Sequence, residues 1–299
     1  MQIDVAFCGG KRLEKHLDKS GLRVPVFTVV TAIFNGAQDL ERTILSVINQ
    51  SYNDVEYIII DGGSSDGTLD ILRKYEYAVD YWISERDKGI YDAFNKACHL
   101  ITGQWTIFLG AGDVFHDTEV LAKIYDTVQD VGKDTEIIYG KVSLTNNRNT
   151  PLKSLNRPWA QMSDQWRGGR PMLPHHQGVF LRKTILSSED PFDTRYRIAA
   201  DSKLIYKSIK SVDPVFANVI VASVPLGGLS TAPKYVLATA NEIVRINFEL
   251  GFTNYPHQIW FYLKAIFKRW IFSFAGDTAS KRCIDKYRRL TGRASKWNL

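Results

Sequence analysis

Between residues 27 and 113 the chain alternates short apolar runs with segments that carry apolar residues at helical spacing. Four runs are expected to be strands: FTVVTAI (27–33), III (58–60), YWIS (81–84) and WTIFL (105–109). The segments between them, at 40–48, 69–75 and 91–101, are expected to be helices, because their apolar residues recur every three or four positions. Strands that alternate with helices in this way predict an α/β fold with a mostly parallel sheet.

The loop DGGSSDG follows the second of these strands and consists of small and acidic residues. Ligands of open α/β sheets bind beyond the carboxyl ends of the strands, where small residues let the backbone come close. We therefore expect Asp61 to contact a ligand, and Asp66 to cap the helix that begins near Thr68. The loop does not fit a calcium-binding EF-hand, because Gly63 and Ser65 replace the required third and fifth ligands.

The second half of the chain has a weaker pattern. Residues 143–171 are polar, contain three prolines and show little periodicity, so a long loop is expected there. His175 and His176 then precede an apolar run, and adjacent side chains of a strand point to opposite faces, so only one of them can face a site. Asp201 follows two alanines and begins a helical segment, where it is either a functional acid or an N-cap.

Taken in order, these motifs resemble the family 2 glycosyltransferases of the GT-A (Rossmann-like) fold. The motifs are VTAIFNG, SVINQSY, DGGSSDGT, SERDKGIYDAFNKA, GQWTIFLGAGD, HHQGVF and AADSKL, and they extend from about Val24 to Thr231. The chain looks most like the bacterial branch that builds O-antigen and exopolysaccharide chains. The resemblance implies an N-terminal extension (1–24), a catalytic domain (25–232) and a C-terminal region (233–299). Within the catalytic domain, residues 25–142 form the nucleotide-binding half and 143–232 the acceptor half.

The resemblance also implies a uridine pocket made by Thr31, Phe34 and Asp61. An aromatic face can stack on uracil, and a carboxylate can accept the proton on its N3 atom. For Phe34 a place in the core is an equal alternative.

The donor phosphates are expected at the cluster SERDKGIYDAFNKA. Negative charge develops on the leaving group there, so a cation and helix-start amides are needed, and Lys88 or Arg86 can supply the cation. Asp92 and Asn95 lie one helical turn apart and share a face, which makes them candidates for donor binding as well.

The metal motif departs from the common pattern of the family. Many relatives carry Asp-x-Asp and a further Asp after the strand, whereas this chain has Gly110, Ala111 and Gly112 there and retains only Asp113. His176 matches the family position near the donor phosphates and metal. Phosphates and waters can complete an octahedron, so these two residues are expected to hold Mn²⁺ or Mg²⁺. A metal-independent or degenerate enzyme remains an alternative.

Two other interpretations of the GAGD turn and the histidines are weaker. A dinucleotide-binding turn belongs after the first strand, whereas this one follows the fourth and lacks the full G-x-G-x-x-G spacing. The histidines lack the i, i+4 partner of a helical zinc pair.

The resemblance places the catalytic base at Asp201. One carboxylate suffices when an acceptor hydroxyl displaces the nucleotide directly, and this single step inverts the anomeric configuration. The expected function is transfer of a sugar from a UDP-sugar to a lipid-linked glycan in bacterial surface polysaccharide synthesis. The alternatives are a GDP- or dTDP-sugar transferase, or a nucleotide-sugar-binding or scaffold protein that has lost catalysis.

Composition agrees with a cytoplasmic enzyme. The 299 residues are 44% hydrophobic, which is enough for one large domain with an appendage. The three cysteines, Cys8, Cys98 and Cys283, are widely scattered, so neither a disulfide framework nor a zinc module is expected. The N-terminus lacks the apolar segment of a secretion signal.

Positive charge is concentrated in the C-terminal tail. Residues 255–299 contain ten Lys and Arg against two Asp, a surplus of eight, while the whole chain has a net charge of +6. The segment 257–274 predicts a basic, aromatic, amphipathic helix, which either lies at the inner face of a bacterial inner membrane or packs on the catalytic domain. Charge interrupts the tail too often for a membrane-spanning helix. No nucleic-acid-binding motif accompanies the charge.

Overall fold

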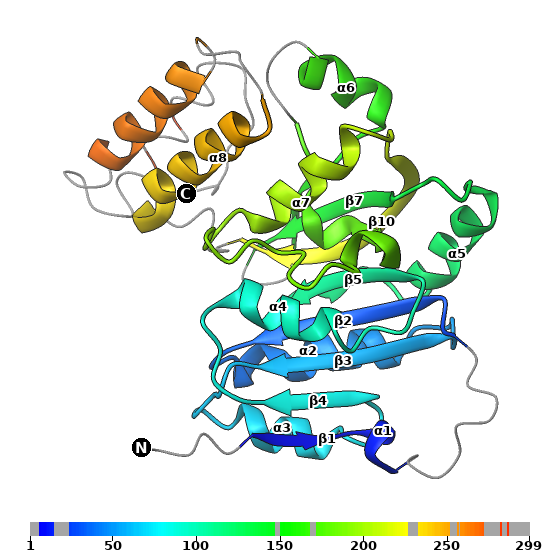
Figure 1. The fold of residues 1–299 in the computed structure, drawn as a ribbon. Helices are drawn as coiled ribbons and strands as arrows, with labels where there is room; N and C mark the ends of the chain where they lie inside the picture. Colours follow the sequence, from blue (N-terminus) through cyan, green and yellow to red (C-terminus); the bar gives the residue numbers. More distant parts are fainter. Residues whose placement is uncertain are drawn as a thin grey trace. The chain divides into compact units, whose positions relative to one another are not determined.

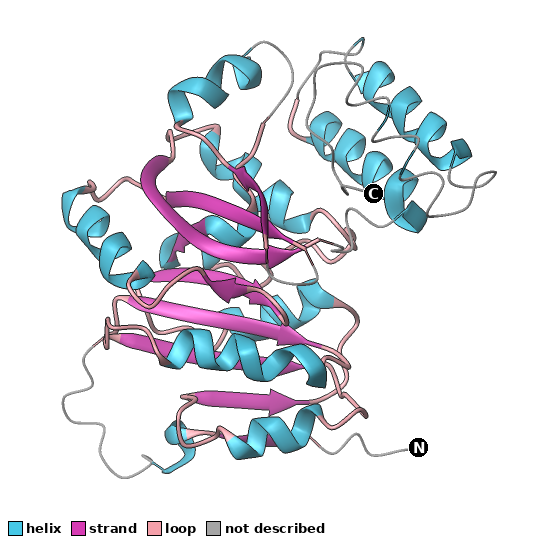
Figure 2. Ribbon diagram, turned by 180° about the vertical axis from the view of Figure 1, so that it is seen from behind, coloured by secondary structure: helices cyan, strands magenta, loops and turns pink. Residues whose placement is uncertain are grey.

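The computed structural model of the chain describes residues 6–14, 24–146, 150–167, 172–226, 233–251, 256, 258–271, 282 and 286. The chain forms two compact units, residues 1–226 and 227–299, and each is described by itself. The first unit is a sheet with helices on both faces (Figures 1 and 2).

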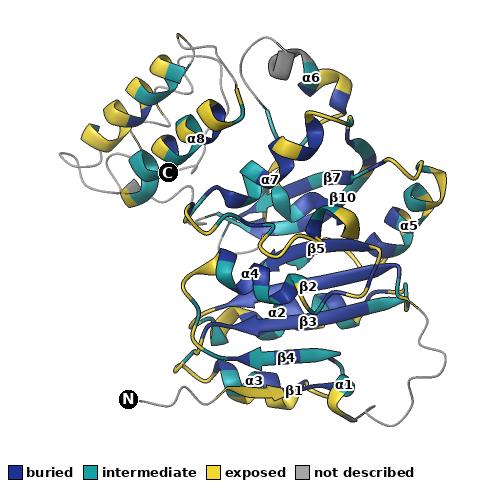
Figure 3. Cartoon of the chain, viewed as in Figure 1, coloured by how far each residue is buried: buried dark blue, intermediate teal, exposed yellow. Residues whose placement is uncertain are grey.

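The four strands of this sheet between residues 27 and 110 are parallel, as the sequence predicts. Strand β2 (Phe27–Ile33) lies between β3 (Val55–Asp61) and β5 (Trp105–Gly110), and β4 (Tyr81–Ser84) pairs with the outer side of β3. Every residue of β2 is buried, because the strand lies in the middle of the sheet with both faces covered (Figure 3).

Three helices connect these strands: α2 (Ala37–Ile48), α3 (Thr68–Lys74) and α4 (Ile90–Cys98). The two longer ones cover opposite faces, with α4 in front of the sheet in Figure 1 and α2 behind it. All three helices lie within a few residues of the predicted segments.

Beyond β5 the sheet is mixed, which refines the expectation of a mostly parallel sheet. Its order continues β5-β9-β7-β10-β6, and the pairs β5–β9, β7–β9 and β10–β6 are antiparallel, whereas β10 and β7 are parallel. The strands are β6 (Val114–Phe115), β7 (Ile137–Thr145), β9 (Val179–Arg182) and β10 (Val215–Pro225). Helices α5 (Val120–Asp130) and α7 (Ala200–Ile209) complete this half, with the short turns η1 (His176–Gly178) and η2 (Lys183–Leu186) beside β9.

The expected long loop at 143–171 is wrong for most of its length. Strand β7 continues to Thr145, β8 (Pro151–Leu155) pairs with it, and α6 (Trp159–Arg167) follows. Strand β8 has no buried residue, so it lacks the apolar alternation by which a strand is recognised. Trp159 and Met162 of α6 are buried, and two apolar positions three residues apart are too few to predict a helix.

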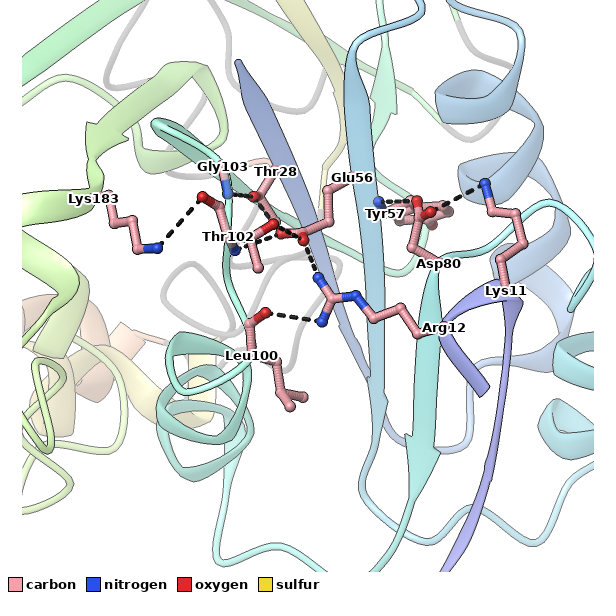
Figure 4. A network of polar contacts seen from close by, with 10 residues as sticks. All are labelled: Lys11, Arg12, Thr28, Glu56, Tyr57, Asp80, Leu100, Thr102, Gly103 and Lys183. Carbon is pink, nitrogen blue, oxygen red and sulfur yellow. Dashed lines mark hydrogen bonds and ion pairs between the residues drawn. The ribbon is translucent and has the colours of Figure 1, made fainter. Parts of the chain in front are cut away.

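Within the predicted N-terminal extension, residues 7–9 form an edge strand of the sheet. Strand β1 (Phe7–Gly9) pairs antiparallel with β4, and α1 (Lys11–Glu14) follows. Arg12 forms an ion pair with Glu56, whose side chain is 5% exposed. Figure 4 shows the network: Glu56 also accepts hydrogen bonds from the Thr28 hydroxyl (2.6 Å) and the Thr102 main chain (2.9 Å). A buried carboxylate needs such partners, so residues 10–14 are held to the end of the sheet.

The second unit is helical in its described residues. The turn η4 (Pro233–Tyr235) leads into α8 (Val236–Glu249), and residues 258–271 form a further helix, as expected from the sequence. Within the described part of the chain, no helix combines the length and apolar character that crossing a bilayer requires.

Candidate active site

The carboxyl ends of the parallel strands meet at one edge of the sheet, as the sequence predicts. Ile33 pairs with Asp61, Asp61 with Ser84, and Ala32 with Gly110. The loops after β2, β3, β4 and β5 therefore begin side by side, and most of the predicted donor-binding residues lie in or next to them (Figure 1).

Asp61 is completely buried, and its carboxylate braces its own loop. It accepts hydrogen bonds from the Ser64 main chain (3.0 Å) and hydroxyl (2.5 Å) and from the Ser84 hydroxyl (2.5 Å). In this geometry Asp61 sets the shape of the loop, and its contact with a nucleotide stays a prediction.

Asp66 satisfies free main-chain N–H groups at two helix starts. It accepts from Thr68, the first residue of α3, at 3.2 Å, and from Ala37, the first residue of α2, at 3.0 Å. A hydrogen bond from the Thr68 hydroxyl lowers the pKa of Asp66 most, and the two main-chain bonds lower it further. The N-caps of α3 and α2 are Gly67 and Gly36, so the expected N-cap position of Asp66 is wrong; its carboxylate instead accepts from the first main-chain N–H of each helix.

Thr31 and Phe34 differ in accessibility. Thr31 is fully buried in β2, and its hydroxyl lies 3.1 Å from the hydroxyl of Tyr57 on β3. Phe34, just beyond β2, is 64% exposed. Core filling by Phe34 is therefore wrong. Its ring is available to a ligand, whereas the Thr31 side chain is engaged inside the sheet.

The loop before α4 presents two exposed cations, Arg86 and Lys88. The main-chain N–H of Lys88 donates to Asp92 at 2.9 Å, which places Asp92 at the start of the helix. The Lys88 side chain is exposed. Asp92 also lies 3.9 Å from Lys96, one turn later. Lys88 and Asp92 thus lie at a helix N-terminus, where anions are favoured.

Asn95 is buried and has a different set of partners. Its amide nitrogen donates to the Phe192 carbonyl (2.8 Å), and its amide oxygen accepts from the Phe192 N–H (3.0 Å). Both atoms of the amide are used to fasten α4 to the segment before α7. The geometry supports a structural role for Asn95 rather than the predicted contact with the donor.

Asp201 is the second residue of α7, and two side chains hold it. His176 Nδ1 lies 2.9 Å from one carboxylate oxygen, and the Tyr91 hydroxyl donates to the other at 2.8 Å. The N-cap of α7 is Ala199, and no side chain caps this helix. Asp201 is therefore not the N-cap, and its carboxylate is 15% exposed.

The charges of this group stabilise each other. Burial alone would raise the pKa of Asp201, but the nearby His176 and the hydrogen bonds from His176 and Tyr91 lower it below its usual value. Burial would likewise lower the pKa of His176, but its bond to Asp201 and the charges of Asp201 and Asp113 raise it. Asp201 is consequently ionised at neutral pH, as a general base has to be.

An aromatic cluster lies beneath the acid. The rings of Tyr91, Phe94, Phe108 and Phe192 pack with centroid distances between 4.5 and 6.0 Å. A cavity of about 10 Å³, too small for a ligand, is lined by three of these phenylalanines together with His176 and Asp201. Because Asn95 holds Phe192 by its main chain, it helps to support this cluster.

Asp113 lies at the turn after β5, close enough to His176 that each affects the pKa of the other. Burial raises the pKa of Asp113 to about 6, against the opposing effects of His176, the Gly110 N–H and Gln177. One of its oxygens accepts from the Gly110 main chain at 2.9 Å. Gly112 has φ +96°, so an aspartate at this position of the family motif would be strained.

Asp113 and His176 fit a divalent ion only in part. A carboxylate oxygen and an imidazole nitrogen are suitable ligands for Mn²⁺, and a ligating histidine commonly donates its other ring N–H to a carboxylate, as His176 does to Asp201. However, no three His, Cys, Asp or Glu side chains gather as a metal-binding group among the described residues. Phosphate oxygens and waters would have to complete the coordination.

Sequence reasoning missed three residues of the site. Tyr91 bonds to Asp201 across 110 positions of the chain, and no local pattern reveals such a contact. Arg42 on α2 donates to the Gly112 carbonyl at 2.8 Å and braces the turn that carries Asp113. Gln177 opposes the rise in the pKa of Asp113, and only its position directly after His176 could have drawn attention to it in the sequence.

The family model described as glycosyl transferase family 2 matches residues 28–188, more than half of the chain. The chain therefore belongs to this family. It is a glycosyltransferase that uses a nucleotide-sugar donor, and inverting chemistry is typical of the family.

Two relatives illustrate the range of similarity in sequence. The chain is 29% identical over 215 residues to a PGL/p-HBAD biosynthesis glycosyltransferase of Mycobacterium bovis, covering 70% of this chain and 80% of the relative. It is 30% identical over 187 residues to an uncharacterised glycosyltransferase, alr2836, of Nostoc sp., covering 60% of this chain and 58% of the relative.

Solved structures show the same GT-A fold. The mannosyltransferase PcManGT from Pyrobaculum calidifontis, in complex with GDP-Man and Mn²⁺, matches with a TM-score of 0.60 and 16% identity, covering 94% of this chain and 85% of the other. Residues 1–349 of S. aureus TarS in complex with UDP match with a TM-score of 0.53 and 14% identity, covering 89% and 77%.

Proposed function

We propose that the protein is an inverting glycosyltransferase that moves a sugar from a UDP-sugar to a lipid-linked glycan in the synthesis of a bacterial surface polysaccharide. The observation that carries the proposal is the geometry of Asp201. This ionised acid is held by His176 and Tyr91 near Asp113, within the domain that carries the donor edge of the sheet.

In the proposed reaction the acceptor hydroxyl attacks the anomeric carbon of the donor sugar. Asp201 takes the hydroxyl proton as the new bond from oxygen to carbon forms. The bond from the anomeric carbon to the phosphate oxygen breaks on the opposite side, and the nucleoside diphosphate leaves with the electron pair. A single displacement of this kind inverts the anomeric configuration.

The leaving group is the second requirement of the reaction. Lys88 and the N–H groups at the start of α4 can bind the departing phosphates. A divalent ion held by Asp113 and His176 would supply further positive charge at the phosphates. His176 would then bind the ion through Nε2, because its Nδ1 donates to Asp201.

Support for the nucleotide and the acceptor is less direct. The exposed Phe34 ring can stack on a uracil, although a guanine or thymine would stack as well. TarS was solved with UDP and PcManGT with GDP-Man, so GDP- and dTDP-sugars stay as alternatives. The mycobacterial relative is named for PGL/p-HBAD biosynthesis rather than for O-antigen. A lipid-linked acceptor would place the enzyme at the inner face of the bacterial inner membrane.

A binding protein that has lost catalysis is the other candidate. It would retain the nucleotide edge, and the missing carboxylates at Gly110 and Gly112 favour it. However, a binder has no need for an ionised acid with two dedicated hydrogen-bond donors, and that arrangement favours the enzyme.

The test is a panel of UDP-, GDP- and dTDP-sugars examined by thermal shift with and without Mn²⁺. A donor at 100 times its Kd stabilises the folded state by about 2.7 kcal/mol, which gives an easily measured rise in Tm. We expect UDP-sugars to give the largest rise, and the selected donor to release its nucleotide faster with enzyme than without it. Donor binding without nucleotide release in the presence of candidate lipid-linked acceptors would favour the binding protein. A larger rise in Tm with GDP- or dTDP-sugars would contradict the proposed UDP-sugar donor.

A further inference from the structure

The helix at 258–271 exposes a continuous apolar stripe. Six large apolar side chains of this helix are between 44% and 61% exposed: Ile259, Trp260, Leu263, Ile266, Phe267 and Trp270. Their spacing of three and four residues places them on one face of the helix. Tyr262 and Ile271 of the same helix are only partly exposed.

The helix is buried on the opposite side. Ala265 is 6% exposed, and at 100° per residue it lies across the helix from Leu263 and Trp270. A small residue at the buried side lets the helix approach its neighbours closely. The large side chains are therefore not the ones by which the helix packs within its unit.

Basic side chains flank the stripe. Lys264, Lys268 and Arg269 are exposed, and residues 258–271 contain no acid. The Lys264 ammonium lies 4.9 Å from the centre of the Trp260 ring, so charge and aromatic surface are in contact. Lysine stems and tryptophan rings are both suited to the boundary between lipid headgroups and acyl chains.

We propose that this face of the helix docks onto the surface of an anionic lipid bilayer. The apolar stripe enters the headgroup boundary, while the three cations meet the lipid phosphates. The charge complementarity favours a bilayer over a second copy of the chain, which would bring like charges together. The acceptor proposed above would reside in the same membrane, but docking needs no transfer activity.

The test is co-sedimentation of the full chain with vesicles that contain one third phosphatidylglycerol, compared with pure phosphatidylcholine vesicles. We expect binding to the anionic vesicles, weakened by salt, with Lys264→Gln/Lys268→Gln lowering the partition coefficient by about tenfold or more, because each cation near an anionic surface is worth about 1 kcal/mol. The matched charge control is Lys133→Gln/Lys207→Gln, which removes two exposed lysines of the first unit and should bind like the wild type.

The aromatic face needs its own variant. Trp260→Ala/Trp270→Ala keeps the charge and should also reduce binding by about tenfold or more, whereas Phe7→Ala/Tyr77→Ala, which removes two exposed aromatic rings elsewhere, should not. Circular dichroism checks that each variant is folded. The proposal is overturned if wild type does not bind anionic vesicles, or if the tryptophan variant binds as well as wild type. Sugar transfer is measured separately, so loss of either property leaves the other interpretable.

Discussion

Replacing Asn95 with alanine separates a structural role from a role in donor binding. The Asn95 side chain is 3% exposed, and its amide makes two hydrogen bonds to the main chain of Phe192, at 2.8 and 3.0 Å. Phe192 is itself 1% exposed, so water cannot easily replace these bonds. The substitution therefore leaves one N–H and one carbonyl of Phe192 without partners.

The size of the effect follows from these two groups. An unsatisfied buried donor or acceptor costs about 1–3 kcal/mol, so we expect a loss of roughly 2–4 kcal/mol of unfolding free energy after partial relaxation. For a unit of this size, 1 kcal/mol corresponds to about 2–4 °C in Tm, so the expected decrease is roughly 4–16 °C. At temperatures below thermal unfolding, the donor affinity should change less than about threefold, because among the described residues the Asn95 side-chain amide has no hydrogen bond besides the two to Phe192.

The assay is differential scanning calorimetry combined with isothermal titration of the donor at 15 °C. His99→Ala is the matched control, because His99 is an exposed residue that follows α4 directly, and its Tm should change little, corresponding to less than about 0.5 kcal/mol. If Asn95→Ala keeps the wild-type Tm but weakens donor binding more than tenfold, the structural interpretation is refuted and the residue binds the donor.

Three further variants address the metal, the N-terminal network and acid stability. Asp113→Ala should make donor affinity insensitive to Mn²⁺ in titrations with and without EDTA; donor binding by the wild type that is equally insensitive would contradict the proposed ion site. Arg12→Met should lower the unfolding free energy in urea by roughly 2–3 kcal/mol, because Glu56 keeps a buried charge without its cation; an unchanged midpoint would show that the pair is dispensable. Hydrogen bonds from Arg195 lower the pKa of Asp193 in the folded protein. The ionised Asp193 therefore stabilises the fold above the pKa of an unfolded aspartate, near 3.9, and this stabilisation is lost as the pH falls below that value. Asp193→Asn should therefore flatten the dependence of Tm on pH below about pH 4. An unchanged slope would show that the bonds between Arg195 and Asp193 do not contribute to stability.

The nucleotide-binding half could be predicted well from the sequence because its signals are local. Strands 27–33 and 81–84 have the predicted bounds, since both are short apolar runs that lead into a polar loop. The position of the site at one edge followed from topology, because parallel strands place their carboxyl ends together. The local preference of Asp for helix starts placed Asp66 one residue off, because the N-cap is Gly67 and Asp66 bonds to Thr68 from the position before it.

The acceptor half and the partners of the acids were not accessible in this way. Strand β8 has no fully buried residue, so its pairing with β7 leaves no apolar alternation in the sequence. Tyr91 and Asp201 are 110 positions apart, and Asn95 and Phe192 are 97 apart. Contacts of this range depend on how α4 and α7 pack, and a single sequence does not encode that packing in any short pattern. The inward orientation of Thr31 and the enclosure of Asp61 depend on the neighbouring strands as well.

The most direct test of the proposed mechanism is the Asp201→Asn variant, measured with the donor that the thermal-shift panel selects and a lipid-linked acceptor. Asparagine keeps the size of the side chain and can still accept one hydrogen bond, but it cannot take the acceptor proton. We expect donor affinity within about threefold of the wild type and a decrease in turnover of ~10²–10⁴, the range typical of general bases. Turnover close to that of the wild type, with donor binding intact, would remove Asp201 from the reaction and contradict the account of this site.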